Sequence, residues 1–271
     1  MPLSRWSCAE LAAELMARSV VAAISPATVW RVLHGDAIRP WFHRMWIFPR
    51  DPDFAAKAAA AALDLYARIF EGEALGPKEF VICADEKTSI QARCRCHPTL
   101  PPGKARLMRV EHEYDRGGAL AYLAAYDVHR ARVMGRCEDT TGIVPFGRLV
   151  EQVMTAEPYA SAERVFWIVD NGRSHRGQAS VKRLEGQWAN LRLIHLPVHA
   201  SWLDQCEIYF SIVQRKVVNP NDFTDLDQIV ARLAAFETRY NAVADPFDWT
   251  FGRDDLDKLL ARLETHRARA V

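Results

Sequence analysis

The chain has 271 residues, of which 49% are hydrophobic and 25% are charged, and its formal net charge is +1. These values are ordinary for a globular protein and leave room for one large domain with a small appendage. The charge excludes a uniformly basic nucleic-acid binder, and no apolar run reaches the roughly 18 residues that a transmembrane helix needs. The amphipathic N-terminal segment contains Glu10 and Glu14, so we expect no secretory signal and a cytoplasmic location.

The first 50 residues are predicted to form a separate helical segment. Ser7 and Glu10 have the spacing of a capping box, which predicts the start of a first helix. Ser25 followed by Pro26 predicts the start of a second helix. Two short helices with a tight connection are typical of a helix-turn-helix, whose second helix enters the DNA major groove, although such pairs also occur in proteins that do not bind DNA.

The second helix is expected to turn Val29 and Leu33 inward. The candidate DNA contacts on its other face are Thr28, Trp30, Arg31 and His34. Residues 36–53 are rich in proline and aromatic side chains and are predicted to form a linker to a domain that spans residues 51–271.

Further along the chain, strands alternate with helices, which predicts an α/β domain. The predicted elements are a helix over 54–70, a strand over 79–86, an antiparallel hairpin over 118–138 that turns near Asp127, a helix over 142–156, a strand over 164–170, a helix over 176–189, a strand over 191–198, and helices over 201–218, 226–243 and 254–268.

Two of the predicted strands end in an acidic residue. Residues 165–169 are all hydrophobic, as in a strand buried on both faces, and Asp170 follows them. The apolar run over 79–86 ends at Asp85 in the same way. Ligands of open α/β sheets bind at the carboxyl ends of strands. Asp170 could alternatively serve only the turn that Asp-Asn-Gly favours.

A third acid, Glu207, lies on the helix that follows the last strand. The predicted inward apolar stripe of this helix consists of Leu203, Cys206, Phe210, Val213 and Val217. We expect Glu207 to lie within this stripe and Asp204 to lie on the opposite, wet side. A carboxylate on an apolar face is costly unless a cation pairs with it, and that cation could be a metal ion or a side chain such as Lys87.

Three carboxylates without histidine or thiol ligands suit Mg²⁺ or Mn²⁺. Two such ions can activate a water molecule or a 3′-hydroxyl and stabilise the leaving oxygen of a phosphodiester. Cys94, Cys96 and His97 do not predict a zinc site, because a second spaced pair of ligands is absent.

Residues 87–109 contain six basic side chains and are predicted to form an extended basic loop. These side chains are Lys87, Arg93, Arg95, Lys104, Arg106 and Arg109. The candidate contacts with a DNA backbone are Arg93, Arg95, Lys104 and Arg106, and a merely solvated loop is the alternative.

Five segments together resemble the catalytic domain of bacterial mariner-superfamily transposases, and above all the insertion sequence 630 group, also described as DDE superfamily endonucleases. The segments are CADEKTSIQA, HPTLPPG, MRVEHEYDRGGALAYLAAYDV, VDNGRSH and SWLDQCEIYFSIVQRKV. The resemblance implies an RNase H-like fold of the retroviral-integrase type, with a mixed five-stranded sheet flanked by helices. It also implies a catalytic and metal-binding triad of Asp85, Asp170 and Glu207, the last two 37 positions apart (207 − 170).

The resemblance further implies two Mg²⁺ or Mn²⁺ ions per active site. The implied reaction cleaves double-stranded DNA at the terminal inverted repeats of a transposon and joins the 3′-hydroxyl to a TA target, with a homodimer in the synaptic complex. Lys87 and His175 are candidates for orienting the substrate, and a structural hydrogen bond is an equal alternative for His175. A bacterial, nucleoid-associated location follows from the same resemblance.

The sequence departs from the family pattern at three points. Similar members carry an additional N-terminal helix-turn-helix, so we expect recognition of transposon ends to be weaker here or supplied elsewhere. Ser174 stands where many members have threonine, and Asp204 stands where asparagine is usual. Two other functions stay open: a truncated or domesticated DNA-binding relative that does not cut, and an RNase H-like nuclease of RNA–DNA hybrids.

Overall fold

The computed structural model describes residues 6–35, 49, 51–103 and 106–269. The chain divides into two compact units, Met1–Phe48 and Pro49–Val271, each of which is described by itself. Most of the predicted linker and the candidate residue Lys104 lie outside the described residues. No helix in the described part of the chain is long and apolar enough to cross a bilayer.

The described residues of the smaller unit form the two predicted helices, α1 (Cys8–Ala17) and α2 (Pro26–Gly35). The capping box of α1 is present, since the Glu10 backbone N–H donates to Ser7 Oγ and the Ser7 backbone N–H donates to the Glu10 carboxylate. Val29 is the buried residue of α2.

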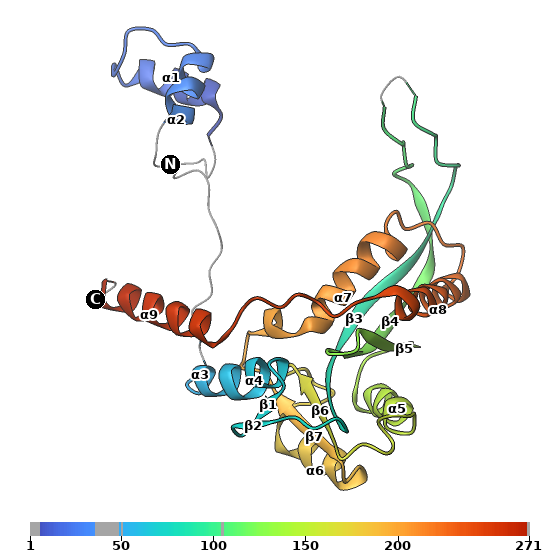
Figure 1. Cartoon of the computed structure of the whole chain (residues 1–271). Coiled ribbons are helices and arrows are strands. Elements are labelled where there is room, and N and C mark those ends of the chain that lie inside the picture. The colour runs from blue at the N-terminus through green and yellow to red at the C-terminus, as the bar shows by residue number, and fades with distance from the viewer. Residues whose placement is uncertain (1–5, 36–48, 50, 104–105, 270–271) are drawn as a thin grey trace. The chain divides into compact units, whose positions relative to one another are not determined.

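The larger unit is built on a mixed five-stranded sheet with the strand order β5-β4-β3-β6-β7 (Figure 1). The strands are β3 (Glu79–Arg95), β4 (Tyr114–Asp127), β5 (Arg132–Glu138), β6 (Arg164–Val169) and β7 (Leu191–His195). β3, β6 and β7 are parallel, and β4 and β5 are antiparallel to their neighbours. The predicted mixed five-stranded sheet is confirmed.

Helices cover both faces of this sheet. Alternate residues of β6 face opposite ways: Phe166 and Ile168 join one apolar core, and Trp167 joins the other. One face packs against α5 (Ile143–Met154) and α6 (Gly177–Gln187). The other face packs against α4 (Asp64–Tyr66), α7 (Gln205–Val213) and α8 (Leu226–Val243).

The remaining elements are short or terminal. They are α3 (Phe54–Ala56), η1 (Lys57–Leu63), β1 (Ile69–Phe70), β2 (Glu73–Ala74), η2 (Ser201–Leu203), η3 (Gln214–Val218) and α9 (Arg253–Arg269). The predicted helix over 54–70 therefore ends early, at Tyr66. Arg68 has a positive φ of 60°, and the chain then forms the β1–β2 hairpin.

Two sequence-based boundaries in β3 are wrong for one reason. Asp85 does not end a strand, and the segment from Lys87 to Arg95 is not a loop, because β3 continues to Arg95 paired with β4. Beyond the sheet, β3 and β4 extend together as a two-stranded ribbon (Figure 1). Leu100 and Arg109 pair further along it.

The edge of this ribbon is held by a segment far away in the sequence. Asn221 accepts from the Arg93 backbone N–H at 3.2 Å, and Asp222 accepts from the Arg95 backbone N–H at 3.0 Å. The Phe223 backbone N–H donates to the Arg93 carbonyl at 2.8 Å. These bonds satisfy backbone groups that an unpaired strand edge would leave exposed.

Candidate active site

The register of two parallel strands places Asp85 beside Asp170. Ala84 of β3 pairs with Val169, the last residue of β6, so the next residue of each strand is an aspartate. Parallel neighbours lie about 4.8 Å apart across the sheet. The two acids therefore share the sheet position at which β6 ends and β3 continues.

Asp170 is held in place by its own turn and by a buried histidine. Its Oδ1 accepts a hydrogen bond from the Gly172 backbone N–H at 2.6 Å and lies 2.7 Å from His175 Nε2. The hydrogen bond with His175, above all, holds the pKa of Asp170 below its usual 3.8. Asn171 donates from its side chain to the Leu196 carbonyl at 2.7 Å and ties the same turn to the end of β7.

The His175 ring is fully buried and fixed from several sides. Its centroid lies 4.8 Å from that of Phe146, and its Nδ1 lies 3.2 Å from Ser174 Oγ. The Ser174 hydroxyl also donates to the Glu86 carboxylate, next to Asp85. His195 Nε2 lies 2.6 Å from the His175 carbonyl oxygen. His175 therefore has the position of a residue that orients Asp170.

The helix that carries Glu207 begins later than predicted. Asp204 has extended backbone angles and caps α7, because its Oδ1 accepts from the Cys206 backbone N–H at 2.8 Å. The predicted inward stripe is confirmed, since all five of its members are buried. Two expectations about the acids are wrong: Asp204 is only 1% exposed, and the Glu207 side chain is exposed rather than inside the stripe.

The start of α7 packs against β3 through a tyrosine. The Tyr66 hydroxyl donates to the Leu203 carbonyl at 2.6 Å and lies 3.1 Å from Cys83 Sγ. This contact brings the first turn of α7 next to the strand that carries Asp85. The structure thus gathers Asp85, Asp170, Glu207 and Asp204 in one region, with Asp204 on its core side.

The four acids influence one another electrostatically. Burial raises the pKa of Asp85 to about 7, and the negative charges of Asp170 and Glu207 act in the same direction. Burial also raises the pKa of Asp204 well above its usual 3.8, and the charge of Asp85 adds to this effect. A bound cation would therefore relieve the electrostatic repulsion among these acids.

The chemistry of these side chains fits a hard divalent cation. Within the described residues, none of the ion pairs involves Asp85, Asp204 or Glu207, and Asp204 Oδ2 is a buried atom without a hydrogen-bond partner. Carboxylate oxygens are the ligands that Mg²⁺ and Mn²⁺ prefer. As they stand, the described side chains form no group of three already spaced for a metal ion.

Lys87 lies on β3 two residues beyond Asp85 and is half-buried. The part of the chain that the structure describes contains no ion pair between Lys87 and Glu207. The alternative that Lys87, and not a metal ion, compensates the charge of Glu207 therefore lacks support.

Two of the candidate DNA contacts lie on the ribbon and share one aromatic ring. The guanidinium groups of Arg93 and Arg95 lie 4.8 and 5.3 Å from the ring centroid of Tyr114. Arg106 is exposed near the described end of the ribbon. Tyr114 was not identified from the sequence, because its pairing opposite Arg95 depends on the register of β3 and β4.

The candidate contacts on α2 are mostly exposed. Trp30, Arg31 and His34 are exposed, and the Trp30 and His34 rings stack with centroids 4.7 Å apart. Thr28 is only partly exposed, since its Oγ1 accepts from Arg31 at 3.2 Å and lies 2.9 Å from Ser25 Oγ. The Thr28 backbone N–H in turn donates to Ser25 Oγ at 3.1 Å, so Ser25 caps the helix.

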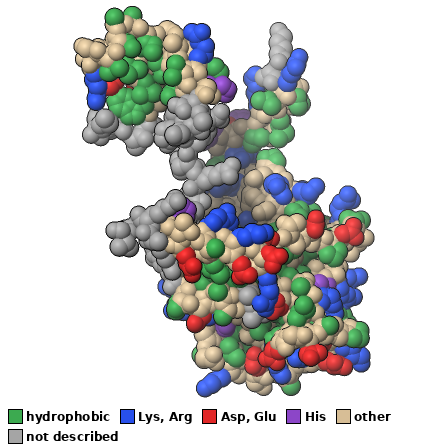
Figure 2. Space-filling model, turned by 60° about the vertical axis from the view of Figure 1, so that its left-hand side comes forward, with side chains coloured by type: hydrophobic (Ala, Val, Ile, Leu, Met, Phe, Trp, Pro, Cys, Tyr) green, Lys and Arg blue, Asp and Glu red, His purple; other side chains and the backbone are tan. Residues whose placement is uncertain are grey.

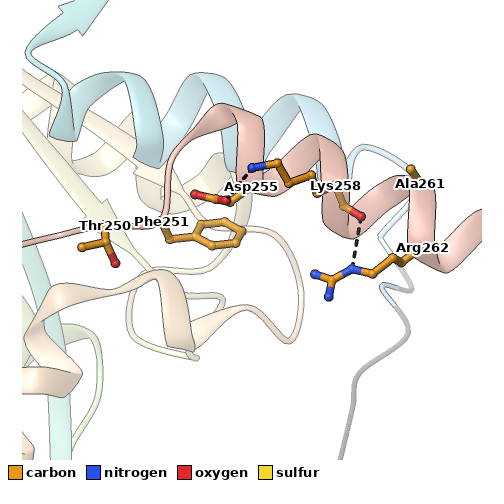
Figure 3. A pocket seen from close by; sticks show the side chains of 6 residues that line it. All are labelled: Thr250, Phe251, Asp255, Lys258, Ala261 and Arg262. Carbon is orange, nitrogen blue, oxygen red and sulfur yellow. Dashed lines mark hydrogen bonds and ion pairs between the residues drawn. The ribbon is translucent and has the colours of Figure 1, made fainter.

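The surface hollow along α9 is not part of this site. It is lined by Thr250, Phe251, Asp255, Lys258, Ala261 and Arg262 (Figure 3). Its acid, Asp255, is paired with Lys258 at 3.3 Å. On the face that Figure 2 shows, basic and acidic side chains are interspersed over the larger unit, in keeping with the net charge of +1.

Comparison with known proteins identifies the family. The sequence model of the DDE superfamily endonuclease family matches residues 80–230, which is more than half of the chain. The chain belongs to the DDE superfamily endonucleases. The match covers the strands and the helix that carry Asp85, Asp170 and Glu207. No curated protein matches this DDE-family chain.

Solved structures with a similar fold include three Mos1 mariner complexes. The paired-end complex with Mn is 14% identical, with a TM-score of 0.57, and covers 97% of this chain and 78% of that chain. The complex with the left transposon end is 16% identical, with the same TM-score and coverage. The paired-end complex with Mg is 16% identical, with a TM-score of 0.53, and the match covers 99% of this chain and 80% of that chain. The predicted RNase H-like fold is confirmed.

Proposed function

We propose that this DDE-family chain is a DNA transposase that cuts phosphodiester bonds at transposon ends and joins the freed 3′-hydroxyl to a TA target. The observation that carries the proposal is the pairing of Asp85 with Asp170 across two parallel strands, with Glu207 on the helix beside them. Neither Asp85 nor Glu207 forms an ion pair with a basic side chain among the described residues, which leaves both carboxylates to a metal ion.

In this proposal Asp85, Asp170 and Glu207 hold two Mg²⁺ or Mn²⁺ ions. The bound ions would supply Lewis-acid activation of the attacking oxygen and stabilisation of the leaving oxygen. The protein itself positions the ligands: His175 and the Gly172 backbone N–H orient the Asp170 carboxylate, and the β3 backbone fixes Asp85. The Mn and Mg complexes of Mos1 support the choice of cations.

The DNA would be held by two groups of basic and aromatic residues. Arg93, Arg95, Lys104 and Arg106 would contact phosphates, and α2 would enter the major groove of the transposon end. Lys87 would contact the substrate next to Asp85. The paired-end complexes of Mos1 support DNA as the partner. A homodimer in the synaptic complex stays a prediction. Membership in the bacterial insertion sequence 630 group stays a prediction.

The decisive experiment incubates the purified chain with supercoiled plasmid and Mg²⁺ or Mn²⁺. We expect metal-dependent nicking that Glu207→Gln and Asp85→Ala both abolish, while Asp85→Ala retains its fold and its affinity for DNA. Nicking by Asp85→Ala at the wild-type rate would refute the triad. A folded wild-type chain that binds DNA without nicking it would instead indicate a relative that no longer cuts. A preference for RNA–DNA hybrids over duplex DNA would indicate an RNase H-like nuclease.

A further inference from the structure

Asp204 is the most buried acid next to the proposed triad. Its side chain is 1% exposed and lies between the start of α7 and β3. One oxygen, Oδ1, accepts the capping hydrogen bond from the Cys206 backbone N–H at 2.8 Å. The other oxygen, Oδ2, is buried without a hydrogen-bond partner among the described residues. A buried carboxylate oxygen in this state is costly.

Helix capping does not explain why this residue is an acid. Asparagine and serine cap helices about as well as aspartate, and neither introduces a charge. Capping uses Oδ1 as an acceptor and makes no demand on Oδ2. The buried Oδ2 therefore has room for a stronger partner than the Cys83 thiol beside it.

The surroundings of Asp204 show what kind of group this would be. The strongest charge acting on it is that of Asp85, followed by that of Asp170, and both are negative. The Tyr66 hydroxyl is already used by the Leu203 carbonyl at 2.6 Å. The Cys83 thiol lies nearby, but a thiol is a weak donor. A cation with several oxygen ligands would compensate all of these acids at once.

We propose that Asp204 contributes a fourth carboxylate to the cation-binding site, on the core side of Asp85. This proposal rests on the proposed function of Asp85 and Asp170 as metal ligands and adds a residue to their site. Asp204 differs from the three triad acids in approaching the cations from inside the protein, where water does not compete with it. Its charge would tighten cation binding without contacting DNA.

The test measures Mn²⁺ binding by titration calorimetry on the full chain without DNA. Asp204→Asn keeps the size of the side chain and the capping acceptor and removes only the charge. Groups that support metal ligands change metal affinity by about 10- to 100-fold, so we expect Asp204→Asn to bind Mn²⁺ at least about tenfold more weakly than the wild type. The matched control is Glu237→Gln, which neutralises a partly buried acid on α8 and should leave the affinity unchanged.

A second readout does not depend on measuring affinity. Without metal, Asp204→Asn should melt at a higher temperature than the wild type, because a neutral amide does not repel the neighbouring Asp85. Saturating Mn²⁺ should then raise the melting temperature less in the variant than in the wild type. Asp204→Ser, which also caps a helix, provides the same comparison if Asp204→Asn does not fold.

The outcomes separate this inference from the proposed function. If Asp204→Asn binds Mn²⁺ as tightly as the wild type while Glu207→Gln binds it more weakly, Asp204 is only a helix cap and the inference is overturned. If the folded wild type does not bind Mn²⁺ at all, the proposed metal site itself is wrong, and the fourth ligand is wrong with it.

Discussion

The buried ring of His175 contacts Asp170 directly, with 2.7 Å between His175 Nε2 and Asp170 Oδ1. The histidine is fully buried, whereas the Asp170 side chain is 35% exposed. The contact therefore links the core to a carboxylate that can still reach a ligand. The Asp-Asn-Gly turn therefore positions the Asp170 carboxylate as well as reversing the chain.

The first prediction concerns this contact. His175→Gln keeps much of the side-chain volume but removes the ring that orients Asp170. We expect a 10- to 100-fold decrease in Mn²⁺ affinity and a matching decrease in plasmid nicking, the usual effect of removing the partner of a metal ligand. His129→Gln, in a half-buried histidine that bonds to the Tyr66 carbonyl, is the control and should retain both. Unchanged Mn²⁺ affinity in a folded His175→Gln protein would assign His175 to structure alone.

The second prediction uses the glycine between the two residues. A Cβ at Gly172 would lie 2.8 Å from Asp170 Oδ1 and 3.1 Å from His175 Nε2, so the Asp170 carboxylate would have to move. We expect Gly172→Ala to nick DNA at least about tenfold more slowly, since displaced catalytic groups are costly. Gly147→Ala, where nothing lies within 4 Å of the new Cβ, should nick normally. A wild-type rate in Gly172→Ala would show that the position of Asp170 is not critical.

The third prediction concerns pH and stability. Burial raises the pKa of Glu237 from 4.5 to about 7, although its carboxylate accepts from the Gly135 backbone N–H at 2.9 Å. The folded state thus binds this proton more tightly than the unfolded state, and the resulting stabilisation, complete below pH 4.5, disappears as the pH rises through 7.

Glu237→Gln should remove this pH dependence. We expect Glu237 to contribute about 2 kcal/mol to the change in the free energy of unfolding between low and high pH. This is less than the full pKa shift would give, because Glu237 is partly exposed. Urea unfolding at about pH 5 and about pH 8, on either side of the raised pKa, measures the effect: the variant should gain stability over the wild type only at the higher pH. Glu151→Gln, at an exposed position of α5, should follow the wild type at both values. Parallel curves for Glu237→Gln and the wild type would show that Glu237 ionises normally.

The fourth prediction concerns the ribbon. Replacing Arg93 and Arg95 by alanine should weaken DNA binding about equally for all sequences. It should also lower the slope of log K against log salt by about 0.9 for each phosphate that the variant no longer neutralises. Arg232→Ala is the control, because Arg232 also lies over an aromatic ring, that of Phe223, at 5.8 Å. An unchanged salt dependence in the double variant would leave the ribbon without a role in DNA binding.

Much of the fold could be predicted because strong local patterns survive in the structure. The apolar run over 165–169 forms a strand buried on both faces, and the apolar spacing after Leu203 forms the buried side of α7. Both patterns predict burial, because burial depends directly on how apolar the side chains are. The position of Asp170 at the end of β6 could be predicted from the same apolar run.

What could not be predicted depends on partners distant in the sequence. β3 extends beyond Asp85 because β4 continues to pair with it, as far as Arg95 opposite Tyr114. The burial of Asp204 was missed because the helix was expected to be continuous from residue 201. The spacing of Asp204 and Glu207 resembles a capping box, and this local pattern could have revealed the helix start at Gln205.

Because β3 is longer than predicted, one strand sets an upper limit on the distance between Asp85 and the arginines of the ribbon. Asp85 and Arg93 are eight positions apart (93 − 85) on one strand, and at about 3.3 Å per residue they can be separated by at most about 26 Å. That length corresponds to roughly seven or eight base pairs of B-DNA at about 3.4 Å each. If both ends touch the same duplex, β3 limits the distance between the cut site and the anchored phosphates. Moving the arginines along β3 would then shift the footprint relative to the cut.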